Sequence, residues 1–356
     1  MKKRGIIRMN KRIKTMVSVL LVSVMGITLG ACQPKEIETP EVETPDEAEG
    51  VKVTDHLDRE VVFEKTPERL VSGYYITSSM LMALGLTDKM VGIEAKAENR
   101  PLYSLAAPEL LDVPNVGTAK EFNLEGALAL NPEMLVVPVR LKDIVETMEG
   151  LGVKALGVNP ESFTEMEEVL LMLGEATGTS DRAKEIISYN KELLAKAKAL
   201  AGKGSEEEKV TVYFGGNSSL LTTAGGKMHQ SSLIEEAGAL NVAKELEDSY
   251  WSEVSYEQIL SWQPDYIIIA SDASYTVEDV LNDSVLSDLS AIKEKKVYRL
   301  PSNIESWDSP VPASALGVLA ISSYLYEEEY DAEEFKADVV SYYEKFYGFT
   351  FTEALN

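Results

Sequence analysis

One short pattern occurs twice in this chain, at residues 123–137 and 255–269. Each copy has a helix-capping residue, an acid two positions later, a proline seven positions after the acid, and then an apolar run. Capping side chains accept free N–H groups of the first helical turn, an acid there suits the helix dipole, and proline stops the helix. An apolar run without alternation is typical of a parallel strand covered on both faces. The repeat therefore predicts two α/β lobes that share one topology.

The stretch between the copies contains one long helical pattern. Ser180 can cap it, apolar residues follow at helical spacing to Leu200, and Gly202 comes just after its end. Because no strand pattern accompanies it, we expect a rigid single helix that connects the lobes. The predicted first lobe, connecting helix and second lobe span residues 51–178, 179–202 and 203–350.

The N-terminal segment has the composition of an export signal. Seven basic residues and no acids lie in the first 14 positions, and an apolar run follows to Leu29, just before Cys32, the single cysteine of the chain. The run is short for a membrane span, and a lone cysteine cannot form an intramolecular disulfide. The pattern resembles the bacterial lipoprotein signal, although a free thiol in an uncleaved anchor helix is the alternative. We expect a signal peptide at 1–31, a lipid anchor at Cys32 and a disordered acidic, proline-containing tether at 32–50.

Charge and composition exclude several classes of partner and site. The formal net charge of −25 argues against binding to nucleic acid or to an anionic membrane surface. The chain has two histidines, and His56 falls in a predicted hairpin turn, so a metal bound directly by side chains is not expected. His229 and Met228 would be haem ligands only if the ligand were haem. No Gly-x-Ser-x-Gly motif is present, which argues against an α/β hydrolase, the alternative from another class.

Several short motifs along residues 51–347 are weak singly but specific when taken together. They are Val53-Thr-Asp55 with Arg59-Glu-Val61, Pro67-Glu-Arg-Leu-Val71, Ala83-Leu-Gly85, Asn131-Pro132, and Trp251-Ser-Glu-Val-Ser-Tyr-Glu257 leading to Gln263-Pro-Asp265. This set resembles the substrate-binding lipoproteins of ABC importers for iron–siderophores, haem and cobalamin.

The resemblance implies an α/β fold of two Rossmann-like lobes joined by one long backbone helix, with the ligand in a cleft between them. It also implies a protein that is not an enzyme and has no cofactor of its own. Such a protein is a monomer that delivers its ligand to an ABC permease with its ATPase, outside the cytoplasm and held to the membrane by a lipid.

One departure from the family pattern concerns docking to the permease. Members commonly carry a Glu in the first helix of the first lobe, and this chain has Ser79 at that position. The docking acid of the second lobe falls at Glu235. Ser232 and Glu235 also have the spacing of a capping box, so a capping role is an equal alternative.

Ligands of open α/β sheets lie beyond the carboxyl ends of the strands, and this rule selects the candidate site. Aromatic side chains there suit a planar or chelated ligand, and Arg140 suits a carboxylate or oxyanion, although packing at the rim is the alternative for each. The first lobe contributes the candidates Tyr74, Tyr75, Arg100, Lys120 and Arg140. The second contributes Tyr213, Asn217, Trp251, Asp272, Tyr275 and Trp307. The expected ligand is an iron–siderophore or a related chelate or tetrapyrrole such as cobalamin or haem, and the alternative is an oxyanion such as molybdate.

Overall fold

The computed structural model of the chain describes residues 50–202, 209–247 and 251–355. The residues in these ranges belong to one compact unit. The expected signal peptide, Cys32 and nearly all of the tether lie outside the described residues. Within the described ranges, no helix is both long and apolar enough to cross a membrane.

The first sheet is parallel and has the strand order β4-β3-β5-β6. Its strands are β3 (Leu70–Ser72), β4 (Met90–Gly92), β5 (Met134–Pro138) and β6 (Lys154–Val158). Alternate residues of β5 point to opposite faces, so Leu135 and Val137 pack with α4 (Lys142–Gly150) while Met134 and Val136 join the main core. This burial on both faces explains the unbroken apolar run of the first repeat. The same sheet is flanked in sequence by α1 (Tyr75–Ala83), α2 (Pro101–Ala106) and α3 (Leu124–Ala129).

The second sheet repeats this order as β9-β7-β11-β12, again parallel. These strands are β7 (Thr211–Gly215), β9 (Leu240–Asn241), β11 (Tyr266–Ile269) and β12 (Val297–Arg299), and β8 (Thr222–Thr223) and β10 (Ser252–Glu253) extend it antiparallel. Its helices are α7 (His229–Glu236), α8 (Tyr256–Trp262), α9 (Val277–Leu281) and α10 (Ser290–Lys293). The prediction of two α/β lobes of one topology is confirmed.

The repeated stretch has the same local structure in both lobes. Asn123 caps α3 by accepting the N–H of Gly126 at 2.9 Å, and Ser255 caps α8 in the same way. The residue before each proline, Asn131 or Gln263, adopts a left-handed backbone with φ of 47°. This conformation turns the chain out of the helix and into the buried strand.

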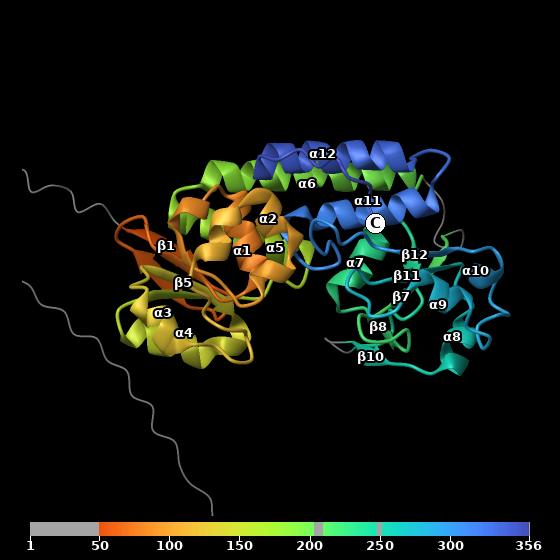
Figure 1. Cartoon of the computed structure of the whole chain (residues 1–356), viewed down its shortest axis with the longest axis horizontal. Coiled ribbons are helices and arrows are strands. Elements are labelled where there is room, and N and C mark those ends of the chain that lie inside the picture. Colours follow the sequence, from red (N-terminus) through yellow and green to blue (C-terminus); the bar gives the residue numbers. More distant parts are fainter. Residues whose placement is uncertain (1–49, 203–208, 248–250, 356) are drawn as a thin grey trace, which may run out of the picture. The chain divides into compact units, whose positions relative to one another are not determined.

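A layer of helices runs past both sheets (Figure 1). It contains α5 (Phe163–Thr177), α6 (Ser180–Leu200), α11 (Ala315–Leu325) and α12 (Ala332–Tyr347). The long helix is α6, as expected, but Thr179 occupies its N-cap position, so Ser180 is not the cap. In Figure 1 α12 lies along α6, and Lys196 of α6 pairs with Asp338 of α12 at 2.6 Å. The lobes are therefore joined by packed helices, and the structure does not show α6 as a sole connection.

Short elements complete the described chain. The predicted hairpin is β1 (Val51–Thr54) paired antiparallel with β2 (Glu60–Phe63), and its turn places His56 Nδ1 3.0 Å from the N–H of Asn159, which donates to it. This bond ties the hairpin to the chain after β6. The 3₁₀ turns are Thr87–Lys89, Ala97–Asn99, Pro108–Asp112, Val139–Leu141 and Pro312–Ser314.

Candidate functional site

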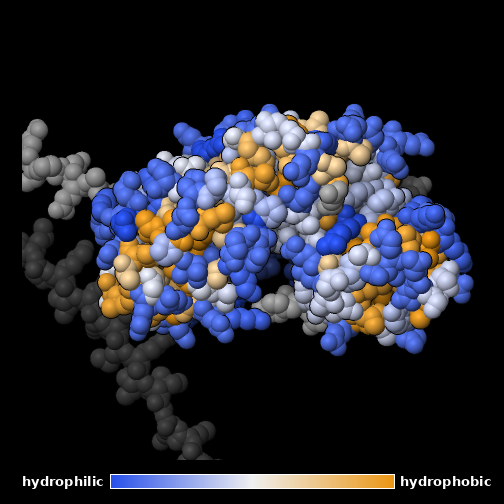
Figure 2. All heavy atoms as spheres, viewed as in Figure 1, coloured by the Kyte–Doolittle hydropathy of each residue, from blue (hydrophilic) through white to orange (hydrophobic). Residues whose placement is uncertain are grey.

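A cavity of about 390 Å³ is lined by segments of both lobes. One wall comes from α1 and from the chain after β4, and the other comes from loops after β11 and β12. These positions agree with the rule that ligands lie beyond the carboxyl ends of parallel strands. The polar and charged residues that line it include Tyr75, Ser79, Lys96, Asn99, Arg100, Asp272, Ser302, Glu305 and Ser306. In Figure 2 the surface is hollowed between the two lobes, with hydrophilic residues along its border.

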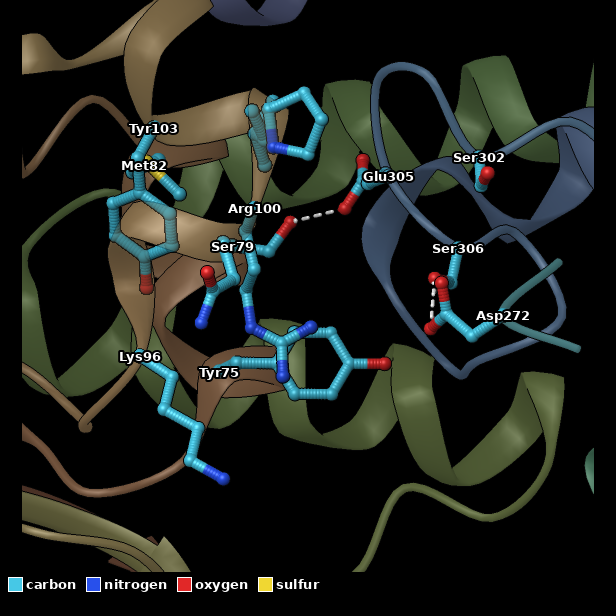
Figure 3. A pocket seen from close by; sticks show the side chains of 13 residues that line it. Tyr75, Ser79, Met82, Lys96, Arg100, Tyr103, Asp272, Ser302, Glu305 and Ser306 are labelled. Carbon is cyan, nitrogen blue, oxygen red and sulfur yellow. Dashed lines mark hydrogen bonds between the residues drawn. The ribbon is translucent and has the colours of Figure 1, made fainter. Parts of the chain in front are cut away.

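Arg100 is the most prominent cation on the first-lobe wall. It precedes α2, and its guanidinium carbon lies 3.7 Å from the centroid of the Tyr75 ring. Figure 3 shows the two side chains together. A cation on an aromatic face is attracted to the ring, and a guanidinium placed there keeps its in-plane N–H donors available. None of the described residues accepts a hydrogen bond from this guanidinium, and its Nε is 4.0 Å from Glu94 Oε1. The arrangement can present a bidentate donor to an anion in the cavity.

Glu94 is a buried acid next to Arg100. Its carboxylate is 5% exposed and accepts hydrogen bonds from the Ser78 hydroxyl and the Tyr103 hydroxyl, both at 2.6 Å. Burial raises the pKa of Glu94, while the hydroxyl donors and Arg100 act in the opposite direction. These contacts hold the acid, and with it the nearby arginine, in one position.

The second-lobe wall is acidic. Glu305 is 7% exposed and accepts from the Ser79 hydroxyl at 3.0 Å and from the Tyr343 hydroxyl at 2.8 Å. Burial raises the pKa of Glu305 to about 7. Asp272 is exposed and accepts from the Ser306 hydroxyl at 2.7 Å, and both of these acids face the cavity in Figure 3. A basic wall thus stands opposite a wall with one buried and one exposed acid.

The structure brings several predicted residues together. Tyr75, Arg100 and Asp272 line the cavity. The Tyr74 ring lies 6.1 Å from the Tyr75 ring at an edge-to-face angle, and the guanidinium carbon of Arg140 lies 5.9 Å from the Tyr74 centroid. The four first-lobe side chains therefore form a row, with Arg100 in the cavity and the exposed Arg140 outside it.

Two predicted aromatic residues belong to the core instead. Tyr213 lies inside β7, is fully buried and donates its hydroxyl proton to the carbonyl of Leu220. Trp307 is 1% exposed and donates its indole N–H to Tyr343 Oη at 2.8 Å. Tyr213 is buried because it lies within β7, two residues before the strand ends at Gly215, and so is not beyond the carboxyl end.

The other second-lobe candidates also lie outside this cavity. Trp251 stacks on Phe214 at 6.2 Å between ring centroids, and Asn217 is exposed. Tyr275 lines a separate hollow of about 260 Å³ together with Asp279. On the first lobe, Lys120 is exposed and is not part of the cavity wall.

His229 is a buried core residue and does not line the cavity. Its ring is 2% exposed, packs on Phe163 at 5.1 Å between centroids, and finds no hydrogen-bond partner among the described residues. Burial lowers the pKa of His229 to about 3, so the ring is neutral. In the described part of the chain, no three His, Cys, Asp or Glu side chains gather in a way that could hold a metal ion.

Sequence reasoning missed Lys96 and Glu305, which both line the cavity. Lys96 follows β4 and has a left-handed backbone with φ of 69°, and Glu305 follows β12. The carboxyl-end rule selects a residue in each of these loops, Arg100 after β4 and Trp307 after β12, but it does not say which side chain of a loop faces the cavity.

The structure shows the surroundings of the two positions considered for docking. Ser79 is 1% exposed and hydrogen-bonds to Glu305 and Tyr347, so it is not a surface residue. The capping box at Ser232 and Glu235 is wrong, because α7 begins at His229 and the Ser232 hydroxyl donates to the His229 carbonyl at 2.6 Å inside the helix. Glu235 is exposed near the end of α7.

Comparison with known proteins identifies the family. The model of the family described as "Periplasmic binding protein" matches residues 70–304. The chain belongs to the periplasmic binding protein family. This confirms the resemblance seen in the sequence, and the protein is a solute-binding protein of an extracytoplasmic class.

Three relatives illustrate the similarity. The molybdate-binding protein MolA of Haemophilus influenzae is 26% identical over 83% of this chain and 90% of its own length. The Bacillus subtilis ABC transporter substrate-binding lipoprotein YvrC is 24% identical over 89% of this chain and 98% of its own. The Bacillus subtilis Fe(3+)-citrate-binding protein YfmC is 24% identical over 65% of this chain and 73% of its own. The solved structure of MolA bound to molybdate superposes with a TM-score of 0.74, covering 85% of this chain and 99% of MolA at 23% identity.

Proposed function

We propose that this protein is the substrate-binding component of an ABC importer and that its ligand is a compact anion, either a ferric chelate of the siderophore or carboxylate type or an oxyanion. The observation that carries the proposal is Arg100, which lies on the Tyr75 ring in a cavity lined by both lobes and has no hydrogen-bond acceptor among the described residues. A guanidinium held in this way is suited to bidentate contact with a carboxylate, a catecholate or an oxyanion.

The cavity volume bears on the size of the ligand. Ligand pockets commonly range over roughly 300–1,000 Å³, so about 390 Å³ lies near the lower end. Such a volume favours a compact chelate or an oxyanion over a whole corrinoid. The relatives named for Fe(3+)-citrate and for molybdate support these two ligand classes, and an oxyanion is the second candidate because MolA aligns over most of both chains.

Binding measurements with purified protein lacking residues 1–32 test this proposal. Isothermal titration calorimetry and native mass spectrometry with ferric citrate, a ferric catecholate, molybdate, cobalamin and haem would show which probe binds. Arg100→Ala should weaken an anionic ligand at least about tenfold, because a charge-assisted hydrogen bond contributes about 1.5–3 kcal/mol. Lys120→Ala, on the same lobe but outside the cavity, is the matched control. Binding of a neutral probe alone, or an anion whose affinity is unchanged by Arg100→Ala, would refute the proposal.

We further propose that Glu235 contacts the permease. Glu235 takes no part in a capping box in this structure. Its side chain is exposed on α7 and is available to a partner. Glu235→Lys should reduce stimulation of the importer's ATPase in proteoliposomes while ligand affinity stays unchanged. Glu192→Lys, an exposed acid on α6, is the control, and equal stimulation by both variants would contradict the assignment.

A lipid at Cys32 would keep the protein at the membrane after export. The relative YvrC is named as a lipoprotein, and Cys32 follows a signal-like segment. Cys32→Ser should move the protein from the membrane fraction to the medium or periplasm. Unchanged membrane association of this variant would exclude an anchor at Cys32.

A further inference from the structure

Glu305 is an unusual residue for the wall of an anion site. It lines the same cavity as Arg100, it is 7% exposed, and no described lysine or arginine lies within ion-pair distance of it. A buried carboxylate without an ion pair is costly, and an anion placed nearby raises that cost through like-charge repulsion. The carboxyl group therefore either repels the ligand or loses its charge.

The hydrogen bonds around Glu305 come from neutral donors. Ser79 of α1 donates to Oε2 at 3.0 Å, and Tyr343 of α12 donates to Oε1 at 2.8 Å. Behind them, the Trp307 indole N–H lies 2.8 Å from Tyr343 Oη and donates to it, and Ser79 Oγ lies 2.9 Å from Tyr347 Oη. Each carboxyl oxygen keeps a further lone pair, so a proton can sit on either oxygen without breaking both bonds. Neutral donors of this kind hold the carboxyl group in place in both of its protonation states.

The charged groups around Glu305 set the direction of the effect. Arg100 and Lys96 face the cavity from the first lobe, and the Arg100 charge lowers the pKa of Glu305 while burial raises it to about 7. When an anion binds to Arg100, it neutralises that favourable charge and adds a negative one. Proton affinity at Glu305 must then rise.

Other titratable groups near Glu305 behave differently. Burial raises the pKa values of Tyr343 and Tyr347, which stay protonated as donors. Asp272 lines the cavity but is exposed. Asp308 does not line it and accepts from the Ser271 N–H at 3.1 Å and the Ser271 hydroxyl at 2.9 Å, with burial raising its pKa to about 6.

We propose that Glu305 carries a proton when an anionic ligand occupies the cavity, so that ligand binding takes up one proton from solvent and the neutral carboxyl group can donate a hydrogen bond to the ligand. This inference rests on the proposed function. A carboxylic acid kept neutral by an apolar site so that it can donate to an anion has precedent in enzymes. Glu305 would thus favour ligands that place a hydrogen-bond acceptor beside it, and it would make the affinity for an anion depend on pH.

The sign of the linkage follows from the proton balance. Below about pH 6 Glu305 is already protonated in the free protein, so binding takes up no proton and affinity is at its maximum. Above about pH 7 each binding event must take up a proton, so affinity falls up to about tenfold per pH unit. Removing the titratable group should remove this slope.

The test uses molybdate as the probe, followed by ferric citrate, in calorimetric titrations from about pH 6 to about pH 8.5. Wild type should lose at least about tenfold in affinity across this range and should take up protons, seen as a dependence of the binding heat on the buffer's ionisation enthalpy. Glu305→Gln keeps the shape. Its carbonyl oxygen can still accept from Tyr343, and its NH2 group can donate to the Ser79 hydroxyl, which can then donate to Tyr347. The variant should bind at about pH 8.5 nearly as tightly as wild type at about pH 6. Asp272→Asn, the other acid on the same wall, should retain the wild-type slope.

Several outcomes would overturn the inference. They are a flat affinity profile for wild type, an equal slope in Glu305→Gln, and loss of binding by folded Glu305→Gln at every pH. In these cases an anion still binds through Arg100, so the proposed function survives. Failure of both probes to bind wild type at any pH would remove both proposals.

A measurement without ligand provides a second check. Subtracting the infrared spectrum of free Glu305→Gln from that of free wild type at about pH 6 should leave a protonated-carboxyl band that fades through about pH 7. The subtraction cancels the contribution of Asp308, whose pKa burial raises to about 6. If this difference spectrum has no such band at about pH 6, Glu305 is ionised there in the free protein, and the predicted affinity maximum at about pH 6 is overturned.

Discussion

Arg100 and Arg140 lie at the two ends of a row whose middle is formed by the rings of Tyr75 and Tyr74. Arg100 is on the cavity wall, whereas Arg140 is exposed and has no place in that wall. Of these two arginines, a ligand confined to the cavity therefore contacts only Arg100. A larger chelate that extends over both tyrosine rings would reach Arg140 as well.

The two arginines therefore report ligand size. If the ligand is an oxyanion such as molybdate, Arg140→Ala should leave affinity within about twofold, because no hydrogen bond is lost. If it is an extended ferric chelate, Arg140→Ala should weaken binding by at least ~1.5 kcal/mol, the value of one charge-assisted hydrogen bond. Calorimetry on the Arg100→Ala and Arg140→Ala pair separates these cases, and equal losses with molybdate would contradict the assignment of Arg140 to the outside.

At the scale of elements, the repeated unit is anchored identically in both lobes. The N–H of Glu133 donates to the carbonyl of Arg69 at 2.8 Å, just before β3, and the N–H of Asp265 donates to the carbonyl of Thr211 at 3.0 Å, the first residue of β7. Each bond joins the residue just before the strand of the repeat (β5 or β11) to the start of the neighbouring strand (β3 or β7). The left-handed backbone of the residue before each proline turns the chain so that this bond can form.

Removing the helix caps of the repeat should destabilise both lobes by similar amounts. Asn123→Ala and Ser255→Ala each delete an acceptor for a free helix N–H, so each should lower the free energy of unfolding by about 1 kcal/mol. Urea denaturation followed by circular dichroism measures this. Ser232→Ala is the control, since Ser232 lies inside α7, and a loss as large as at Asn123 would restore a capping role there.

At the scale of the whole molecule, buried acids make stability depend on pH. Burial raises the pKa of Glu305 to about 7 and that of Asp308 to about 6, so the folded protein binds protons more tightly than the unfolded chain. The stability that these groups contribute is fully present below their unfolded pKa values, near 4, and is lost as pH rises to about 7.

The free energy of unfolding should therefore decrease between about pH 4.5 and about pH 7 through these two groups. Glu305→Gln should remove part of the slope and stabilise the protein at about pH 8 by up to about 3 kcal/mol. Denaturant titrations of wild type and variant at several pH values measure the difference, which cancels the general effect of the net charge of −25. A variant less stable than wild type at about pH 8 would show that the carboxylate is stabilising when charged.

Some features of the fold follow from signals within a few residues. Caps, prolines and unbroken apolar runs lie next to the elements that they start or end, so β5 and β11 could be predicted as equivalent strands. The same kind of signal misplaced Ser232, because a cap spacing does not state where a helix begins, and packing lets α7 start three residues earlier, at His229.

The candidate site was harder to predict. Tyr75 and Arg100 follow strands and reach the cavity, as the carboxyl-end rule suggests. Tyr213 and Trp307 met similar sequence criteria but are buried. Tyr213 lies within β7, and whether a loop residue such as Trp307 faces a cavity or the core depends on which helices cover it.

The sequence by itself determined that there are two α/β lobes of one topology and placed the long helix between them, since periodicity, capping and proline act over a few neighbouring residues. Only the tertiary structure decided the composition of the cavity. The Ser79–Glu305 hydrogen bond joins residues 226 positions apart. The burial that raises the pKa of Glu305 to about 7 comes from α1 and α12 together. Burial and the charge of an acid depend on segments that meet only after folding, so no local pattern encodes them.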